Sequence, residues 1–328
     1  MYTLKINELE QDILQSGQSR IQPSEALALI PATTEQTLDL IQAADRIRRR
    51  FKQQKAFTCA IVNAKSGFCA EDCAFCAQSA HHQTDISTYG LHSAEKLVDI
   101  GLRMSEAGAT NYSMVTSGTC LNAAEIDTVC QVAQTLKART NLTLCASLGM
   151  LSEDAARQLG QAGITRYHHN LETARSFFDQ ICTTHDYEDD IQTVLLAKRA
   201  GLKVCSGGIF GLGESWEQRV ELAFTLRDLG VDSIPVNFLN PIPGTRLAGR
   251  ALLAPLEALA CIALLRFIHP GLDIPVCGGR EVTLKDFQSW VFLAGANGLM
   301  VGNYLTTRGR KLEMDMEMIK EMGMTHAE

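Results

Sequence analysis

The chain has 328 residues and a formal net charge of −7, with 46% hydrophobic and 20% charged residues. This balance is typical of a folded globular protein and excludes a disordered one, and the length allows one large domain. The negative net charge excludes the basic footprint of a nucleic-acid-binding protein. No apolar run approaches the ~20 residues of a membrane-spanning helix, so we expect neither nucleic acid nor membrane as a partner.

Eleven cysteines follow an N-terminus that lacks the apolar core of a signal peptide. A disulfide framework belongs to exported proteins, so these thiols favour metal or redox chemistry in a reducing compartment. We therefore expect a cytoplasmic protein.

Residues 1–50 are expected to form a helical extension. Pro23 and Ser24 are helix start signals ahead of helical apolar spacing over 21–30, and 34–51 repeats that spacing. The second helix ends in the basic run 46–50, which complements the helix dipole. We interpret that run as a solvated last turn.

From Phe57 onward, short apolar runs alternate with helical patterns. The predicted strands are 58–62, 112–115, 142–146, 166–169, 202–205, 233–237, 274–277 and 299–302. The predicted helices are 94–107, 123–139, 153–162, 188–200, 216–229, 255–267 and 284–294. Several helices end in a glycine that is a natural helix cap: Gly108, Gly163, Gly201 and Gly230. Eight alternating units predict an α/β fold, a parallel (β/α)8 TIM-type barrel over 51–310, with a helical tail at 311–328.

Three cysteines lie close together directly after the first predicted strand. Catalytic groups of such barrels gather at this end of the strands. Cys69, Cys73 and Cys76 are spaced for a thiolate-ligated metal. A structural zinc site normally closes with four protein ligands, and this motif has three. It therefore favours an iron–sulfur cluster with one open iron, the alternative being three thiols without metal.

Four further cysteines fall in the first, third, fifth and seventh predicted strands: Cys59, Cys145, Cys205 and Cys277. Inward side chains of one layer in such a barrel come from alternate strands, so these thiols could hold a second cluster. Equally, a free cysteine can be a small buried hydrophobe. That second interpretation is preferred for the cysteines on predicted helices or loops, which are Cys120, Cys130, Cys182 and Cys261.

The motif Cys-x-x-x-Cys-x-x-Cys, with Phe75 before its last cysteine, resembles that of the radical S-adenosylmethionine enzymes. In them the three cysteines hold a [4Fe–4S] cluster whose fourth iron binds S-adenosylmethionine. From about residue 50 to the C-terminus the chain resembles the biotin synthases in particular, through the stretches 63–79, 167–173, 203–214 and 294–297.

That resemblance implies radical sulfur insertion into dethiobiotin, with an auxiliary iron–sulfur cluster as the sulfur donor. It also implies an electron donor of the flavodoxin or ferredoxin type, iron–sulfur assembly machinery and a homodimer. The positions that match cofactor-binding residues are Phe75, Asn170, Glu172 and Ile209. Those that match substrate-binding residues are Lys65, Asn170, Asn237, Thr306 and Thr307.

The sequence departs from the best-known biotin synthases, whose auxiliary [2Fe–2S] cluster is held by three cysteines and an arginine. Cys145 and Cys205 match two of those cysteines. Ser113 stands where the third is expected, and the arginine position falls near Pro275. Arg280 does not match the ligating arginine. With Cys59 and Cys277 added, we expect a different auxiliary cluster held by four cysteines, a four-iron one.

A second departure concerns the cofactor, because Asp189 and Asp190 stand where an arginine could pair with its methionyl carboxylate. Two alternatives therefore remain open. One is a related radical enzyme of the hydrogenase-maturation or methylornithine-synthase type. The other is a non-catalytic iron–sulfur carrier.

Overall fold

The protein is described by a computed structural model that covers residues 2–326. A curved, wholly parallel sheet forms its centre, in the order β5-β4-β3-β2-β1-β9-β8-β7-β6. Its strands are β1 (Lys55–Lys65), β2 (Asn111–Thr116), β3 (Thr143–Ser147), β4 (Arg166–His168), β5 (Lys203–Cys205), β6 (Gly208–Phe210), β7 (Val236–Phe238), β8 (Pro275–Val276) and β9 (Gly298–Val301).

The sheet closes on itself because β5 and β6 are two parts of one barrel strand. β5 pairs with β4, and β6 pairs with β7. Between them, Leu171 N donates to Gly207 O at 3.0 Å on one side, and Ser206 N donates to Ser233 O at 3.0 Å on the other. The barrel therefore has eight strand positions, which confirms the (β/α)8 prediction.

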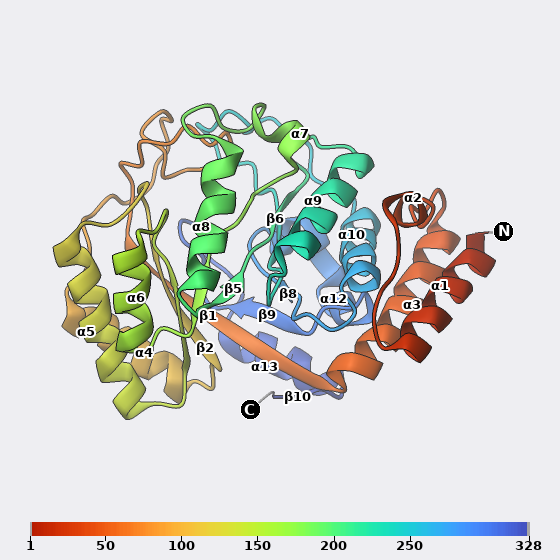
Figure 1. Cartoon of the computed structure of the whole chain (residues 1–328), viewed down its shortest axis with the longest axis horizontal. Helices are drawn as coiled ribbons and strands as arrows, with labels where there is room; N and C mark the ends of the chain where they lie inside the picture. The colour runs from red at the N-terminus through yellow and green to blue at the C-terminus, as the bar shows by residue number, and fades with distance from the viewer. Residues whose placement is uncertain (1, 327–328) are drawn as a thin grey trace.

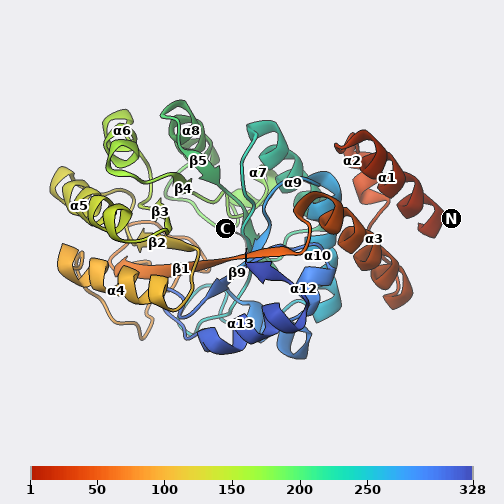
Figure 2. The ribbon, with the colours of Figure 1, turned by 90° about the horizontal axis from the view of Figure 1, so that it is seen from below.

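Helices surround this sheet, as Figure 2 shows. They are α4 (Ala94–Glu106), α5 (Ala123–Arg139), α6 (Glu153–Ala162), α7 (Arg175–Phe178), α8 (Tyr187–Arg199), α9 (Trp216–Leu229), α10 (Pro255–Ile268), α11 (Arg280–Leu284), the 3-10 turn η1 (Lys285–Phe287) and α12 (Trp290–Leu293). The helices α4, α5 and α6 are capped at their N-termini by the side chains of Ser93, Asn122 and Ser152, which accept hydrogen bonds from backbone N–H groups of the first turn. Gly163 ends α6 and Gly230 ends α9, both in the left-handed conformation, as predicted.

The N-terminal helices lie at one side of the barrel (Figure 1). They are α1 (Tyr2–Ser16), α2 (Pro23–Leu27) and α3 (Thr34–Lys52), and α3 packs on α10. Residues 258–268 of α10 are all buried, since the helix lies between α3 and the barrel. The basic end of α3 is not a fully solvated turn, which corrects the prediction. Arg48 is 2% exposed and pairs with Asp45 at 2.7 Å.

Two predicted helices are wrong in extent. The helix expected over 21–30 is the single turn α2, and that expected over 284–294 is broken into η1 and α12 after α11. Lys285 has φ 49° and ψ −116°, a backbone conformation outside the helical region, so the helix ends there.

The tail is also only partly helical. α13 (Leu312–Glu321) ends before Gly323, and β10 (Thr325–His326) then pairs with the start of β1. Thr325 N donates to Gln54 O at 2.7 Å, so the end of the described chain is tied to the base of the barrel.

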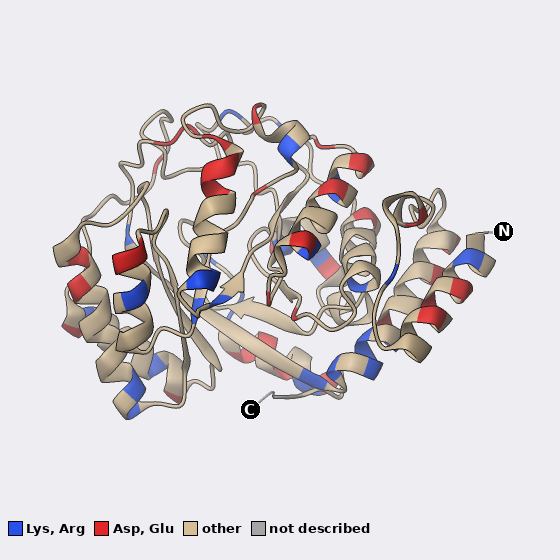
Figure 3. Ribbon diagram, viewed as in Figure 1, with Lys and Arg blue, Asp and Glu red and all other residues tan. Residues whose placement is uncertain are grey.

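Basic and acidic residues are both spread over the outer helices (Figure 3). No helix of residues 2–326 is both long and apolar enough to cross a membrane.

Candidate active site

The first site element is the cysteine loop, residues 66–80, which follows β1. Gly67 and Phe68 both have positive φ, 81° and 54°, and turn the chain back after the strand. Cys69 N then donates to Gln78 O at 3.0 Å, and Cys76 N donates to Cys73 O at 2.9 Å. These backbone hydrogen bonds fold residues 69–78 into a closed loop that carries all three cysteines.

A cavity of about 410 Å3 lies inside the barrel, and we call it the chamber. The loop contributes Cys69, Phe75 and Cys76 to its wall, while Cys73 lines an adjoining cavity of about 200 Å3. The other predicted site residues that line the chamber are Cys59, Cys145, Asn170, Glu172, Cys205, Ile209, Asn237, Cys277, Thr306 and Thr307. The structure therefore brings together nearly all of them.

Lys65 is the exception. It lines neither cavity, and its Nζ lies 2.7 Å from Glu125 Oε1 at the start of α5. It is oriented toward the helix that follows β2 rather than toward the chamber.

The four interior cysteines come from β1, β3, β5 and the end of β8, which are the first, third, fifth and seventh barrel strands. Cys145, Cys205 and Cys277 are 6%, 8% and 3% exposed. Burial raises the pKa of all four thiols, that of Cys205 to about 12. The proximity of Cys59 and Cys205 raises the pKa of Cys277 further.

Such thiols stay protonated unless a cation binds, because a thiolate here would be buried without a partner. Metal binding replaces those protons. Four sulfur donors that line one cavity therefore fit a thiolate-ligated cluster, by the chemistry of the donor set.

The two residues that depart from the best-known ligand set also face this space. Ser113 pairs with Cys145 in register, and both Ser113 and Pro275 line the chamber. Arg280 does not line it, since its guanidinium is held by Asp315 at 2.5 Å and Gln288 at 2.7 Å. As expected, Arg280 is not placed as a ligand.

Asn170 and Glu172 follow β4, at the junction of the two cavities. Asn170 Nδ2 donates to the Glu172 carboxylate at 3.3 Å, and Gly207 N donates to Asn170 Oδ1 at 3.2 Å. Burial, and after it the nearby Asp190, raise the pKa of Glu172 to about 8. A fixed amide and carboxylate of this kind can bind neighbouring hydroxyl groups.

The neighbouring wall is apolar. Phe75 and Ile209 pack against the buried side chains of Ile181, Leu212 and Leu239. This surface offers a place for a flat aromatic ring beside the hydrogen-bonding pair.

Asp190 lies beside the cysteine loop in a network that the sequence did not indicate. His169 Nε2 lies 2.8 Å from its carboxylate and His185 Nε2 lies 3.4 Å from it. His185 Nδ1 lies 2.8 Å from Glu71, inside the cysteine motif. The hydrogen bond to Asp190 is the largest cause that raises the pKa of His185 to about 11, so an imidazolium sits between two carboxylates. Asp189 instead accepts from Asp186 N at the start of α8.

Cys182 was interpreted as a plain core residue, yet it adjoins the same loop. Its Sγ lies 3.9 Å from Cys73 Sγ and 3.3 Å from His185 Nδ1. Glu71, Cys182 and His185 together offer three potential metal ligands within 4.8 Å of one another.

The sequence analysis did not single out Arg166 of β4, which lines the chamber together with the cysteines. Its inward position two residues before His168 was the available signal.

Comparison with family models agrees with this geometry. Residues 64–226 match the Radical SAM superfamily, and residues 235–325 match the Biotin and Thiamin Synthesis associated domain. The barrel with its three-cysteine loop therefore defines a radical S-adenosylmethionine enzyme.

Among curated proteins, a biotin synthase of Syntrophus aciditrophicus is 59% identical over 315 residues, which cover 96% of this chain and 97% of that protein. A biotin synthase of Citrifermentans bemidjiense is 50% identical over 97% of both chains. The chain belongs to the biotin synthase family.

Solved structures share the fold at low sequence identity. Methylornithine synthase superimposes with a TM-score of 0.84 at 18% identity, covering 98% of this chain and 97% of that one. HydG, a maturase of the [FeFe]-hydrogenase, has a TM-score of 0.83 at 16% identity, covering 99% of this chain and 76% of that one. These likenesses support the barrel architecture and carry no argument about substrate.

Proposed function

We propose that this protein inserts sulfur into dethiobiotin to form biotin, by radical chemistry with S-adenosylmethionine. The observation that carries the proposal is the chamber wall, where four cysteines from alternate strands face the same space as the cysteine loop. A sulfide-bearing cluster on these thiols would share one cavity with a radical generated at the loop, which is the arrangement that sulfur insertion requires.

In this proposal Cys69, Cys73 and Cys76 hold a [4Fe–4S] cluster. When bound, that cluster and S-adenosylmethionine supply a 5′-deoxyadenosyl radical that removes hydrogen from an unactivated carbon. The chain itself binds, orients and excludes water. Glu172 and Asn170 would hydrogen-bond the ribose of the cofactor, and Phe75 and Ile209 would pack near its adenine ring.

Asn237 is the proposed anchor for the ureido ring of dethiobiotin. Its Oδ1 accepts from Gly278 N at 2.9 Å, and its Nδ2 lies 3.4 Å from Gly208 O, which fixes the amide plane. Thr306 and Thr307, also on the chamber wall, would receive the carboxylate tail. Lys65 would have to leave Glu125 to reach that tail.

Cys59, Cys145, Cys205 and Cys277 would hold the auxiliary cluster that supplies sulfur. Four thiolates favour a four-iron cluster over the three-cysteine, one-arginine arrangement, because Ser113 and Pro275 offer neither missing ligand. A flavodoxin or ferredoxin type of protein would deliver the electron, and iron–sulfur assembly machinery would load the clusters.

The test is an anaerobic turnover of cluster-loaded protein with S-adenosylmethionine, dethiobiotin and a reductant, with products identified by mass spectrometry. Biotin together with 5′-deoxyadenosine is the expected result. 5′-Deoxyadenosine without biotin, from protein shown to carry both clusters, would contradict the proposed substrate. If neither product forms, the result would contradict radical chemistry altogether and favour an iron–sulfur carrier.

A further inference from the structure

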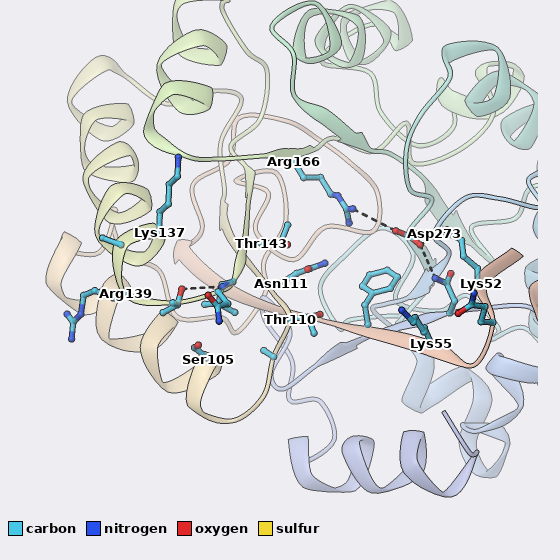
Figure 4. A pocket seen from close by; sticks show the side chains of 18 of the residues that line it. Lys52, Lys55, Ser105, Thr110, Asn111, Lys137, Arg139, Thr143, Arg166 and Asp273 are labelled. Atoms are coloured by element: carbon cyan, nitrogen blue, oxygen red, sulfur yellow. Dashed lines mark hydrogen bonds and ion pairs between the residues drawn. The ribbon is translucent and has the colours of Figure 1, made fainter. Parts of the chain in front are cut away.

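A second cavity, of about 1280 Å3, lies at the opposite end of the barrel from the cysteine loop, and we call it the basin. Figure 4 shows it with the side chains that line it. The starts of β1, β2, β3 and β4 contribute to its wall through Phe57, Asn111, Thr143 and Arg166. Asn111 and Arg166 also line the chamber, so these two side chains separate the two cavities.

Arg166 is poorly satisfied by the protein around it. Its side chain is 13% exposed, and its buried Nε has no hydrogen-bond partner among the described residues. Its nearest acid is Asp273, at 3.8 Å. A buried guanidinium usually has close acceptors on most of its nitrogens, so this group is free to face another negative charge.

Asp273 does not cancel the charge of Arg166. Its carboxylate lies closer to Lys52 Nζ, at 2.9 Å, and accepts from Asn297 Nδ2 at 2.9 Å. Figure 4 shows Asp273 between Lys52 and Arg166. Lys52 and Arg166 share the single negative charge of Asp273, so these three residues together keep one positive charge. The remaining cations of the basin, Lys55, Lys137 and Arg139, are exposed and screened by solvent.

On the chamber side, that charge lies among sulfur atoms. Arg166 pairs with Cys145 in the strand register. Arg166 lines the same chamber as Cys59, Cys205 and Cys277, so its guanidinium shares that space with the thiols of the other strands. Among the described residues that line the chamber, Arg166 is the one lysine or arginine.

A four-iron cluster with four thiolate ligands carries about two negative charges, and net charge is one of the factors that set its reduction potential. Buried in a chamber, such a charge requires a nearby cation. Asn111 adds a weaker contribution, since its Nδ2 donates to Cys59 Sγ at 3.4 Å.

We propose that Arg166 is the counter-charge of the auxiliary cluster, a guanidinium that approaches Cys59, Cys145 and Cys205 from the basin side and stabilises the cluster they hold with Cys277. The inference rests on the proposed function and assigns a role to a residue outside the cysteine set. Arg166 acts through charge, so it sets the retention and reduction potential of the cluster rather than taking part in bond making.

The experiment uses the full-length chain carrying Cys69→Ala, Cys73→Ala and Cys76→Ala, so that the auxiliary cluster is the one source of iron. Into this parent we place Arg166→Met, which removes the charge at similar length, and Arg166→Lys, which keeps it. Arg139→Met, an exposed arginine of the same basin, is the matched control. Iron and acid-labile sulfide are counted after anaerobic reconstitution, and the midpoint potential is measured by titration followed with electron paramagnetic resonance.

Arg166→Met is expected to lose iron and sulfide and to shift the midpoint potential to a more negative value, because the reduced cluster is the more negative form. Arg166→Lys and Arg139→Met should keep the parent's iron, sulfide and potential. If the Arg166→Met protein keeps the parent's iron content and midpoint potential, the role of Arg166 is overturned, while the proposed auxiliary cluster stands. A parent without any iron would overturn the auxiliary cluster itself, and the inference with it. Circular dichroism of each apoprotein shows whether a variant has folded.

Discussion

At the scale of single residues, the position of each cysteine decides what it can do. Of the eleven thiols, three lie on the cysteine loop, and four others line the chamber from the barrel strands. Cys130 is half-buried on α5 and Cys261 is buried on α10, and neither lines the chamber or its adjoining cavity. Geometry rather than residue type therefore separates potential ligands from packing residues.

Replacing Cys277 with alanine tests the auxiliary set directly. The protein should lose the iron and sulfide of one cluster, since three thiolates remain where four are needed, and should still form 5′-deoxyadenosine from S-adenosylmethionine. Biotin formation should be lost. Cys130→Ala is the control and should keep both clusters. Unchanged iron and sulfide in Cys277→Ala would contradict the four-cysteine assignment.

His269 couples folding to pH. It ends α10, is 4% exposed, and its Nε2 donates to Ala223 O at 2.9 Å. Burial lowers its pKa to about 3, whereas an unfolded histidine titrates near ~6.5. As the pH falls below the unfolded value, the unfolded chain gains a proton that the folded chain does not accept. Stability is therefore lost on acidification.

This histidine alone should lower the free energy of unfolding by about 2 kcal/mol between pH 7.5 and pH 5. The loss would stop only near the folded pKa. Urea unfolding of the wild type and of His269→Asn, compared at both pH values, measures it. Equal pH dependence in the two proteins would show that His269 does not couple folding to acidification.

At the scale of elements, the short segment between β5 and β6 belongs to the barrel strand that closes the sheet. Gly207 lies in that break, where a Cβ atom would come within 2.2 Å of Pro235 O. A backbone oxygen at that distance cannot move without shifting the segment that leads into β7. Gly207 is therefore needed because the two backbone segments approach closely. It does not form a left-handed turn, since its φ is not positive.

Gly207→Ala should destabilise the protein by about 2–3 kcal/mol, as overpacking against backbone does. The matched control is Gly249→Ala, where a Cβ would meet nothing within 4 Å. That variant should stay within about 0.5 kcal/mol of the wild type. Thermal unfolding of the three apoproteins compares them, and equal midpoints for Gly207→Ala and wild type would show that the segment can shift at little cost.

At the scale of the whole molecule, one buried ion pair joins the C-terminal helix to the barrel. Asp315 on α13 and Arg280 on α11 lie 2.5 Å apart, with 0% and 1% of their side chains exposed. Arg310 lies 3.5 Å from the same carboxylate. Together these contacts hold α13 near the strand end that carries Cys277, so the tail supports the chamber from outside.

Asp315→Ala should cost about 3–5 kcal/mol, because it leaves the Arg280 charge buried without its partner. The double variant Arg280→Met with Asp315→Leu should recover part of that loss, since it removes both fully buried charges. Asp154→Ala, which breaks an exposed pair with Arg157, should change stability by less than about 1 kcal/mol. A loss as small for Asp315→Ala as for Asp154→Ala would contradict the buried-pair account.

The sequence by itself determined the strand and helix alternation and the class of chemistry. The local signals were the periodic apolar runs, the capping glycines and the spacing of Cys69, Cys73 and Cys76. Signals of this kind can be read from the sequence without a structure. Where a local signal was overridden, as in the helix expected over 284–294, the cause was a backbone conformation at Lys285 that no periodicity reveals.

Only the tertiary structure decided which distant side chains meet. It placed Arg166 in one chamber with cysteines from other strands and His185 against Glu71, and it turned Lys65 toward Glu125. Contacts of this kind depend on barrel closure and on strand register to within one residue, since a slip of one position turns a side chain to the other face. The physical reason is that charge and burial are properties of the space around a group, which the chain creates only by folding.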